Sequence, residues 1–345
     1  MAQSLVFTDT SLPPAEAVSL RQVRIPEYGP TQLLVKMLAA PINPLDLAVL
    51  RGKYPVKPQN LIGNEMIPGS DGTARVIGVG ETVGGFEIGD VVIIRCHCLG
   101  TWRTHAVLEA SDVFKVPRNI DPCLASIFRM GIMPAYFQLR DYHPLHPGDW
   151  IIQNAATSTV AHFVCQFAQL WGVKVISVIR NRPDANAVKK SLQTNGANLV
   201  LTEEELGTAE ALKGMKIVMA IDSVSGPISA KMASVLSSGS TFLTTGFLGA
   251  DDNIHNIDYK KIGWAKDITF KALRLTKVLE TRSTAQQEAM IAWFAESIQQ
   301  GQLKPPLLEC VRWESGDKDL EGRLKDAIGL FDAPIGRKKV LVFDG

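Results

Sequence analysis

The segment 150–184 constrains the fold of this chain more than any other part of the sequence. It begins with an apolar strand, Trp150–Gln153, and continues through a tight turn into an amphipathic helix over Thr159–Trp171. Gly172 ends the helix, and a β-branched strand, Val173–Ile179, follows. A strand, a tight turn, a helix and a second strand in this order predict a βαβ unit, in which the pyrophosphate of a dinucleotide would rest on the helix N-terminus.

The turn of this unit contains no glycine, although dinucleotide-binding turns use glycine for the sharp bend and for close approach to the pyrophosphate. Thr159 places a branched side chain where backbone N–H groups would meet phosphate, and Ala161 is a milder change because helix–strand packing tolerates alanine. The hydroxyls of the turn can donate hydrogen bonds instead. The candidate cofactor-binding residues here are Asn154, Thr157, Ser158, Thr159, Val160 and Ala161. The same sequence also fits a scaffold that keeps its fold and no longer binds a nucleotide.

Two arginines, Arg180 and Arg182, follow the second strand, and the first acidic residue after them is Asp184. An NAD site favours an acidic residue at this strand end, where it accepts a hydrogen bond from the ribose 2′-hydroxyl. Guanidinium groups at this place suit a 2′-phosphate, which arginine binds in bidentate fashion. The sequence therefore predicts NADPH as the cofactor, with a solvated charged loop as the alternative.

The rest of the chain predicts two domains of an α/β protein. Residues 1–120 contain short apolar runs broken by Gly and Pro, which are typical of a compact, irregular β-domain. Strands and helices alternate over residues 121–284, which predicts a doubly wound parallel sheet. Its strands are expected at Trp150–Gln153, Lys174–Ile179, Asn198–Leu201, Ile217–Ile221, Ser240–Gly246 and Ile268–Leu273. Residues 285–345 return to the first domain through a helix, Ala285–Gln300, and an apolar strand, Lys339–Phe343.

The composition excludes several classes of protein. A formal net charge of +1 gives no broad field for nucleic acid or an anionic membrane, and no run of about 18 apolar residues is present to span a bilayer. Five cysteines in 345 residues fit a reducing compartment better than a disulfide framework. The first ten residues show neither a signal core nor an Arg-rich presequence, so the chain is expected to be cytoplasmic or to lack a cleaved targeting segment.

Tyr54 is the candidate catalytic residue of the first domain. It lies in a loop between Gly52 and Pro55, from which its hydroxyl can reach a substrate oxygen as a donor or acid; packing is the alternative role. Gly246 is a candidate for lining the nicotinamide side, because parallel sheets bind ligands at the C-terminal ends of their strands. No metal is expected, because the segment Cys96–Cys98 has no further Cys or His at metal-ligand spacing.

Several segments together resemble a known family. They are 35–46 (VKMLAAPINPLD), Gly52–Pro58, Gly100–Thr104, Ile152–Ala155, Val178–Asp184 and Leu199–Leu206. The chain resembles a medium-chain dehydrogenase/reductase, and within that superfamily the mitochondrial 2-enoyl thioester reductases of fatty acid synthesis. The resemblance implies a GroES-like β-barrel domain, a Rossmann domain, a mitochondrial location and a homodimer formed through the Rossmann sheets. It also implies zinc-free, NADPH-dependent reduction of a trans-2-enoyl group carried on CoA or acyl carrier protein.

The resemblance assigns roles to individual residues. Tyr54 matches the family's catalytic tyrosine, and Asn43 lies in its active-site loop. Arg180 and Arg182 match the residues that bind the 2′-phosphate, and Trp102 lies in a loop near the cofactor.

The chain also departs from the family pattern. The family's Ser-Gly-Val-Gly turn reads Ser-Thr-Val-Ala at 158–161, its aromatic pair near the substrate is absent from Lys271–Arg274, and Arg129–Met133 reads differently. Three hypotheses follow. The chain is an active enoyl thioester reductase, or an impaired one kept as a structural or binding subunit of a larger, for instance mitochondrial, assembly. The third hypothesis is a reductase of quinones or other enones.

Overall fold

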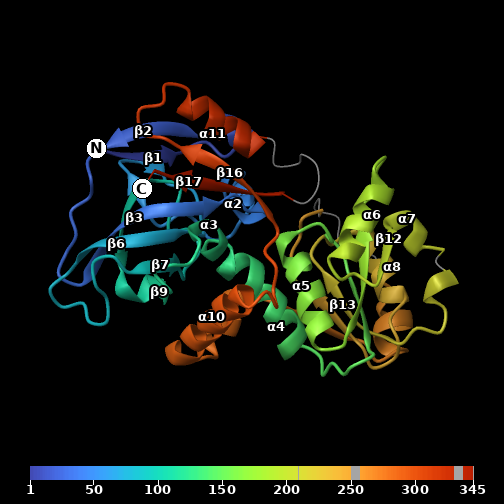
Figure 1. Cartoon of the computed structure of the whole chain (residues 1–345). Coiled ribbons are helices and arrows are strands. Elements are labelled where there is room, and N and C mark those ends of the chain that lie inside the picture. The colour runs from blue at the N-terminus through green and yellow to red at the C-terminus, as the bar shows by residue number, and fades with distance from the viewer. Residues whose placement is uncertain (209, 250–256, 330–336, 345) are drawn as a thin grey trace. The chain divides into compact units, whose positions relative to one another are not determined.

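The computed structural model describes residues 1–208, 210–249, 257–329 and 337–344, in two compact units (Figure 1). Unit 1 comprises Met1–Met130 together with Ser283–Gly345, and unit 2 comprises Gly131–Arg282. The chain therefore leaves unit 1 once and returns to it, so that unit 1 is assembled from both ends of the sequence.

Unit 1 is built on a seven-stranded sheet with the order β16-β17-β3-β6-β7-β9, in which β8 also pairs with β3. Its strands are β3 (Gln32–Pro41), β6 (Thr73–Val79), β7 (Val91–Ile94), β8 (His105–Glu109), β9 (Val113–Val116), β16 (Leu307–Trp313) and β17 (Arg337–Phe343). Along β3, Leu33, Val35 and Met37 are completely buried, while the residues between them are half-buried. This period of two is that of a strand with one face on the core.

The predicted C-terminal strand is confirmed as β17, which belongs to the sheet of unit 1. It pairs antiparallel with β3, with Val340 opposite Pro41 and Val342 opposite Ala39, and parallel with β16. The predicted helix over Ala285–Gln300 is confirmed as α10 (Thr284–Gln299). Ser283 begins it by accepting a hydrogen bond from the Gln286 backbone, in a capping box.

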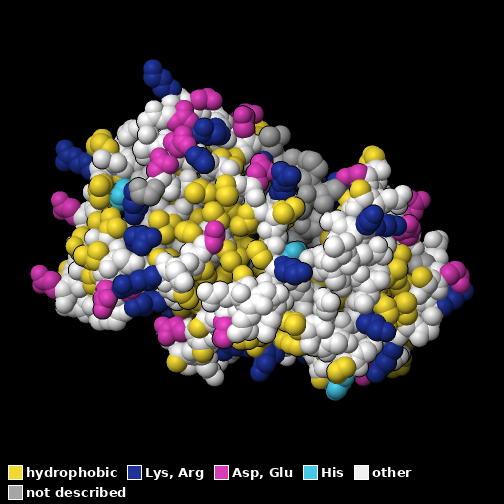
Figure 2. Space-filling view, in the orientation of Figure 1, with side chains coloured by type: hydrophobic (Ala, Val, Ile, Leu, Met, Phe, Trp, Pro, Cys, Tyr) yellow, Lys and Arg dark blue, Asp and Glu magenta, His cyan; other side chains and the backbone are white. Residues whose placement is uncertain are grey.

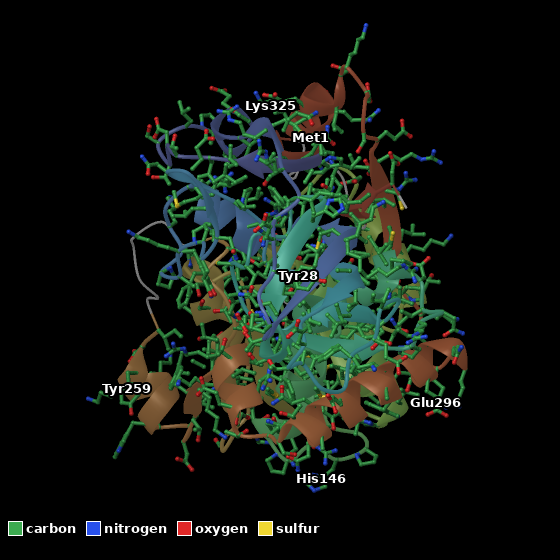
Figure 3. The ribbon with its side chains drawn as sticks, turned by 90° about the vertical axis from the view of Figure 1, so that its left-hand side faces the viewer. Met1, Tyr28, His146, Tyr259, Glu296 and Lys325 are labelled. Carbon is green, nitrogen blue, oxygen red and sulfur yellow. The ribbon has the colours of Figure 1, made fainter. Side chains whose placement is uncertain are left out.

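Smaller elements surround this sheet. They are the ribbons β1 (Ala2–Val6) with β2 (Ser19–Val23) and β4 (Leu61–Ile62) with β5 (Glu65–Met66), and the helices α1 (Pro14–Ala17), α2 (Pro44–Leu50), α3 (Pro122–Ala125) and α11 (Leu320–Gly329). Tyr28 packs on the sheet at Gly78, where a Cβ atom would come within 2.7 Å of the tyrosine ring (Figure 3). Glycine is therefore required for this close approach.

Unit 2 is a six-stranded parallel sheet with the order β12-β11-β10-β13-β14-β15. The strands are β10 (Trp150–Gln153), β11 (Lys174–Ile179), β12 (Leu199–Thr202), β13 (Ile217–Asp222), β14 (Thr241–Thr244) and β15 (Thr269–Ala272). The helices are α4 (Met133–Asp141), α5 (Thr159–Leu170), α6 (Ala185–Thr194), α7 (Glu203–Leu206), α8 (Pro227–Ser234) and α9 (Leu275–Glu280). The strand order reverses between β10 and β13, so the predicted doubly wound α/β fold is confirmed.

The fifth and sixth strands of unit 2 are shorter than the sequence predicts. The strand β14 ends at Thr244 instead of Gly246, and β15 ends at Ala272 instead of Leu273. All four residues of β15, which lies at one edge of the sheet, are exposed.

None of the helices described has both the length and the apolar character needed to cross a bilayer. Lys and Arg side chains are interspersed with Asp and Glu over the face that Figure 2 shows, in keeping with the net charge of +1. All five cysteines are free thiols.

Candidate functional site

The candidate cofactor residues of the glycine-free turn lie at the point of unit 2 where the strand order reverses. Asn154 follows β10 and is buried, and its amide joins the ends of the two central strands. Its Nδ2 donates to Asp222 Oδ1 (2.6 Å), and its Oδ1 accepts from the backbone N–H of Ser223 (2.7 Å). Both ends of the Asn154 amide are thus engaged, and its part is to hold β10 beside β13 at the edge where such sheets bind ligands.

Ala155 takes the backbone conformation that glycine would take in this turn. Its φ is +47°, in the left-handed region, and its carbonyl accepts a hydrogen bond from the Ser158 N–H (2.8 Å). Thr159, in contrast, is the first residue of α5. The missing glycine therefore costs conformational strain at Ala155, a residue that sequence reasoning did not single out, because alanine carries no signal for positive φ.

Replacing Ala155 with glycine is expected to raise the free energy of unfolding of unit 2 by about 0.5–1 kcal/mol, because glycine relieves the left-handed strain. Urea unfolding followed by circular dichroism measures the change. Ala156→Gly is the matched control: Ala156 is buried and is not among the positive-φ residues, so glycine there is expected to lower stability. Equal effects of the two changes would contradict the assignment of strain to Ala155.

The N-terminus of α5 keeps two backbone donors for a ligand. The Ser158 hydroxyl caps the helix by accepting from the Ala161 N–H (3.1 Å). Within the part of the chain that the structure describes, the N–H groups of Thr159 and Val160 have no acceptor. Both residues are half-buried and reachable from solvent. Two free N–H groups at the start of a 12-residue helix fit a pyrophosphate.

The remaining turn residues divide into two roles. The hydroxyls of Thr157 and Thr159 have no hydrogen-bond partner among the residues covered, so they can donate to phosphate. Ala161 is buried, and its carbonyl accepts from the Gln153 side chain (3.2 Å). Because its N–H is also capped by Ser158, Ala161 packs the helix on the sheet and offers nothing to a ligand.

The two arginines after β11 differ in their surroundings. The Arg180 side chain is exposed and has no ion pair or hydrogen bond within residues 1–208, 210–249, 257–329 and 337–344. Arg182 pairs with Asp184, with Nη2 3.2 Å from Oδ2, and hydrogen bonding to Arg182 lowers the pKa of the Asp184 carboxyl. Of the two guanidinium groups at this strand end, that of Arg180 therefore has all of its N–H donors available for a phosphate.

Polar groups also gather at the C-terminal ends of β13 and β14. The Ser223 and Thr245 hydroxyls lie 2.7 Å apart, and the Ser225 hydroxyl donates to the Gly246 carbonyl (3.0 Å). A Cβ atom on Gly246 would lie 3.0 Å from the Ser223 carbonyl oxygen, so Gly246 permits this close approach. Ser223 and Thr245 were not predicted, although polar residues directly after buried strands are the signal that points to them.

In unit 1, Asn43 belongs to a buried network of charges. Its Nδ2 donates to Asp71 Oδ2 (3.0 Å), its Oδ1 accepts from Lys338, and its backbone N–H donates to Asp46 Oδ2 (2.8 Å). Burial raises the pKa of Asp46 to about 7 and lowers the pKa of Lys338 to about 8. The Asn43 amide is thus fully engaged within the protein, and its observed part is to fix the start of α2.

Tyr54 lies in the loop that follows α2 and is half-buried against the core of unit 1. Trp102, by contrast, is completely buried, and its indole N–H points to the Pro41 carbonyl (3.4 Å). Trp102 lies in a loop of unit 1, as predicted, but its indole is buried and exposes no surface of its own. A large aromatic ring that fits the core explains this burial, and the place of its loop near the cofactor stays a prediction.

The structure places the candidate residues in both units. Tyr54, Asn43 and Trp102 lie in unit 1, and the turn residues, the two arginines and Gly246 lie in unit 2. In the described parts of both units, no group of three or more His, Cys, Asp or Glu residues is arranged to hold a metal ion.

Comparison with known proteins gives matches along almost the whole chain. Residues 29–118 match the alcohol dehydrogenase GroES-like domain family. The mitochondrial enoyl-acyl-carrier-protein reductase of Homo sapiens is 33% identical over 321 residues, which cover 91% of this chain and 84% of the human protein.

Solved structures agree with these matches. The mitochondrial 2-enoyl thioester reductase Etr1p/Etr2p heterodimer from Candida tropicalis is 26% identical, with a TM-score of 0.85 over 99% of both chains. The complex of Etr1p with NADP and crotonyl-CoA has the same identity, TM-score and coverage.

Proposed function

Since the chain belongs to the enoyl thioester reductases of the medium-chain dehydrogenase/reductase superfamily, we propose that it is an NADPH-dependent reductase of trans-2-enoyl thioesters. One observation carries the proposal: the start of α5 keeps free N–H donors, and Arg180 is exposed and unpaired at the neighbouring strand end, in the described part of unit 2. The glycine-free turn therefore still offers the groups that a dinucleotide phosphate needs.

Different residues of unit 2 would bind different phosphate groups of the cofactor. Thr159 and Val160 would hold the pyrophosphate through their N–H groups, helped by the Thr157 hydroxyl, and Arg180 would hold the 2′-phosphate. Arg182 can join once the phosphate competes with Asp184, because an exposed ion pair is weak. NADPH, when bound, would supply the hydride that adds to the β-carbon of the enoyl group.

Tyr54 supplies the polar group for the substrate. Its hydroxyl would donate a hydrogen bond to the thioester carbonyl oxygen, where negative charge develops as the β-carbon is reduced. The α-carbon would then be protonated, and we propose Tyr54 as the proton donor. The acyl group would be carried on CoA or on acyl carrier protein, as the names of the relatives indicate.

The assembly and location follow the same relatives. The edge strand β15 is exposed along its length, and an unpaired edge is a ready surface for pairing with another chain. We propose a homodimer formed through the sheets of unit 2, in mitochondria, where the named relatives are located.

A second candidate function rests on the glycine-free turn. Thr159 and Ala161 stand where the family keeps glycine, and the Asn43 amide is fully engaged within the protein, as expected of a retired active site. On this hypothesis the chain is an impaired reductase with a structural or binding role in a larger assembly. A quinone or enone reductase is the further alternative, because the family's aromatic pair is absent from Lys271–Arg274.

The test is a fluorescence titration of the purified protein with NADPH, followed by NADPH oxidation in the presence of crotonyl-CoA. Saturable binding below about 1 mM and oxidation that depends on crotonyl-CoA are expected, within the usual range of enzyme KM values. Absence of saturable binding would favour the retired scaffold. Binding of NADPH with oxidation by quinones but not by enoyl thioesters would favour the third hypothesis.

A further inference from the structure

A buried arginine of unit 1 holds one ring nitrogen of His97. Arg129 is 2% exposed and lies in the π-helical turn Phe128–Ile132, a type of turn that is frequent at functional sites. Its Nε donates to the Arg95 carbonyl (2.8 Å) and its Nη1 to Asp71 Oδ1 (2.6 Å). Its Nη2 lies 2.7 Å from His97 Nδ1. Three bonds to three partners fix the plane of the guanidinium.

The contact with Arg129 decides the tautomer of His97. A guanidinium has only donors, so Nδ1 of His97 must accept, and the imidazole proton must be on Nε2. Protonation of Nδ1 would bring two N–H groups face to face. Burial and the Arg129 charge lower the pKa of His97 to about 3, which keeps the ring neutral. His97 therefore has one donor, Nε2–H, on the part of the ring that Arg129 does not occupy.

The turn that carries His97 also supports the loop that carries Tyr54. The Gln59 backbone N–H donates to the Cys98 carbonyl (3.0 Å), and its side chain donates to the His97 carbonyl (3.2 Å). Asn60 Nδ2 donates to the Leu99 carbonyl (3.0 Å). Cys98 is held at a φ of +58°, a conformation that persists only where the surroundings enforce it. The tyrosine loop is thus tied to the His97 turn by several hydrogen bonds.

The rings of Tyr54 and His97 are in direct edge contact. Their centroids lie 6.3 Å apart with an interplanar angle of 64°, an arrangement that aromatic pairs prefer. Because Arg129 holds the imidazole at Nδ1, the His97 ring limits the directions in which the tyrosine ring can turn.

We propose that His97 is a positioning residue for Tyr54: Arg129 fixes the imidazole as its neutral Nε2–H tautomer, and this ring holds the tyrosine in the direction needed for catalysis. The proposal rests on the role of Tyr54 in the proposed function. It assigns to the segment Cys96–Cys98, for which the sequence predicts no metal, a part in the reaction.

The test compares two substitutions of His97 in the full-length protein. His97→Asn keeps an acceptor for Arg129 at the place of Nδ1 and removes both Nε2–H and the ring, so kcat with crotonyl-CoA is expected to fall about tenfold. The affinity for NADPH and the thermal midpoint should change little. His97→Gln places an amide N–H near the position of Nε2 and should recover part of kcat. His105→Asn is the control, because the His105 Nδ1 atom lies 2.9 Å from the Thr104 hydroxyl and makes no contact with Arg129.

A double-mutant cycle shows whether His97 acts through Tyr54. In the Tyr54→Phe protein, His97→Asn should lower kcat by less than about twofold, because residues that act together are not additive. Equal tenfold losses in both backgrounds would overturn the proposal. Two-bond proton–nitrogen spectra of the wild-type protein read the tautomer without any assay, and a proton on Nδ1 would also overturn it.

These outcomes separate the proposal from the function on which it rests. A wild-type protein that reduces no enoyl thioester overturns the proposed function. An active enzyme whose kcat is unchanged by His97→Asn overturns only the positioning role of His97.

Discussion

Replacing Tyr54 with phenylalanine is expected to lower kcat for the reduction of crotonyl-CoA by a factor of about 10²–10⁴, the range supplied by a positioned proton donor. The half-buried ring packs against the core of unit 1 and against His97, and phenylalanine keeps these contacts. Only the hydroxyl is lost, so the stability of the protein and its affinity for NADPH should stay close to the wild-type values. Steady-state kinetics with NADPH and crotonyl-CoA measure the change.

Tyr28→Phe is the matched control for this substitution. Tyr28 also belongs to unit 1 (Figure 3), but its ring packs on Gly78 and is not part of the tyrosine loop. Loss of the Tyr28 hydroxyl in this control should leave kcat unchanged. A Tyr54→Phe protein with wild-type kcat would show that Tyr54 is neither the hydrogen-bond donor to the thioester carbonyl nor the proton donor to the α-carbon.

The sequence predicts the parts of this protein that are specified locally. The boundaries of β10, β11 and α5 follow from the alternation of apolar strands with a 3.6-residue pattern, and Ser158 provides a local N-cap. The place of Arg180 at the end of the second strand of the βαβ unit follows from the predicted boundary of that strand. These features depend on neighbours within a few residues, so they can be read before any fold is known.

The networks that hold the site are different, because their members lie far apart in the chain. Asn154 and Asp222 are 68 residues apart, and Arg129 and Asp71 are 58 apart. The buried Asp222 accepts from two successive backbone N–H groups, those of Val224 and Ser225 (3.1 and 2.8 Å). No spacing rule predicts such pairs, since each depends on strands that pair only in the folded chain.

Trp102 and Ala155 show two further limits of sequence reasoning. Trp102 lies in a loop of unit 1, as predicted, but its side chain is completely buried, which the loop position does not signal. Ala155 adopts a glycine-like φ of +47° with no local signal. In both cases tertiary packing outweighs the local preference of the residue, and strained positions of this kind concentrate at functional sites.

Replacing Arg180 with alanine is expected to weaken the binding of NADPH by about 10–100-fold and to leave the binding of NADH nearly unchanged. The reason is that the charge-assisted hydrogen bonds to the 2′-phosphate are lost, each worth about 1.5–3 kcal/mol. In the described part of unit 2 the Arg180 side chain has no partner whose loss would destabilise the fold. Fluorescence titrations with both nucleotides give the two dissociation constants.

Arg182→Ala provides the comparison that makes this prediction specific. Arg182 already pairs with Asp184, so its net contribution to phosphate binding is reduced by the free energy of breaking that ion pair. The loss of NADPH affinity in Arg182→Ala should therefore be smaller than in Arg180→Ala. Asp184→Asn should then tighten NADPH slightly, because it releases Arg182. If Arg180→Ala weakened NADH as much as NADPH, the arginine would act on a part common to both nucleotides, and the 2′-phosphate would not be its partner.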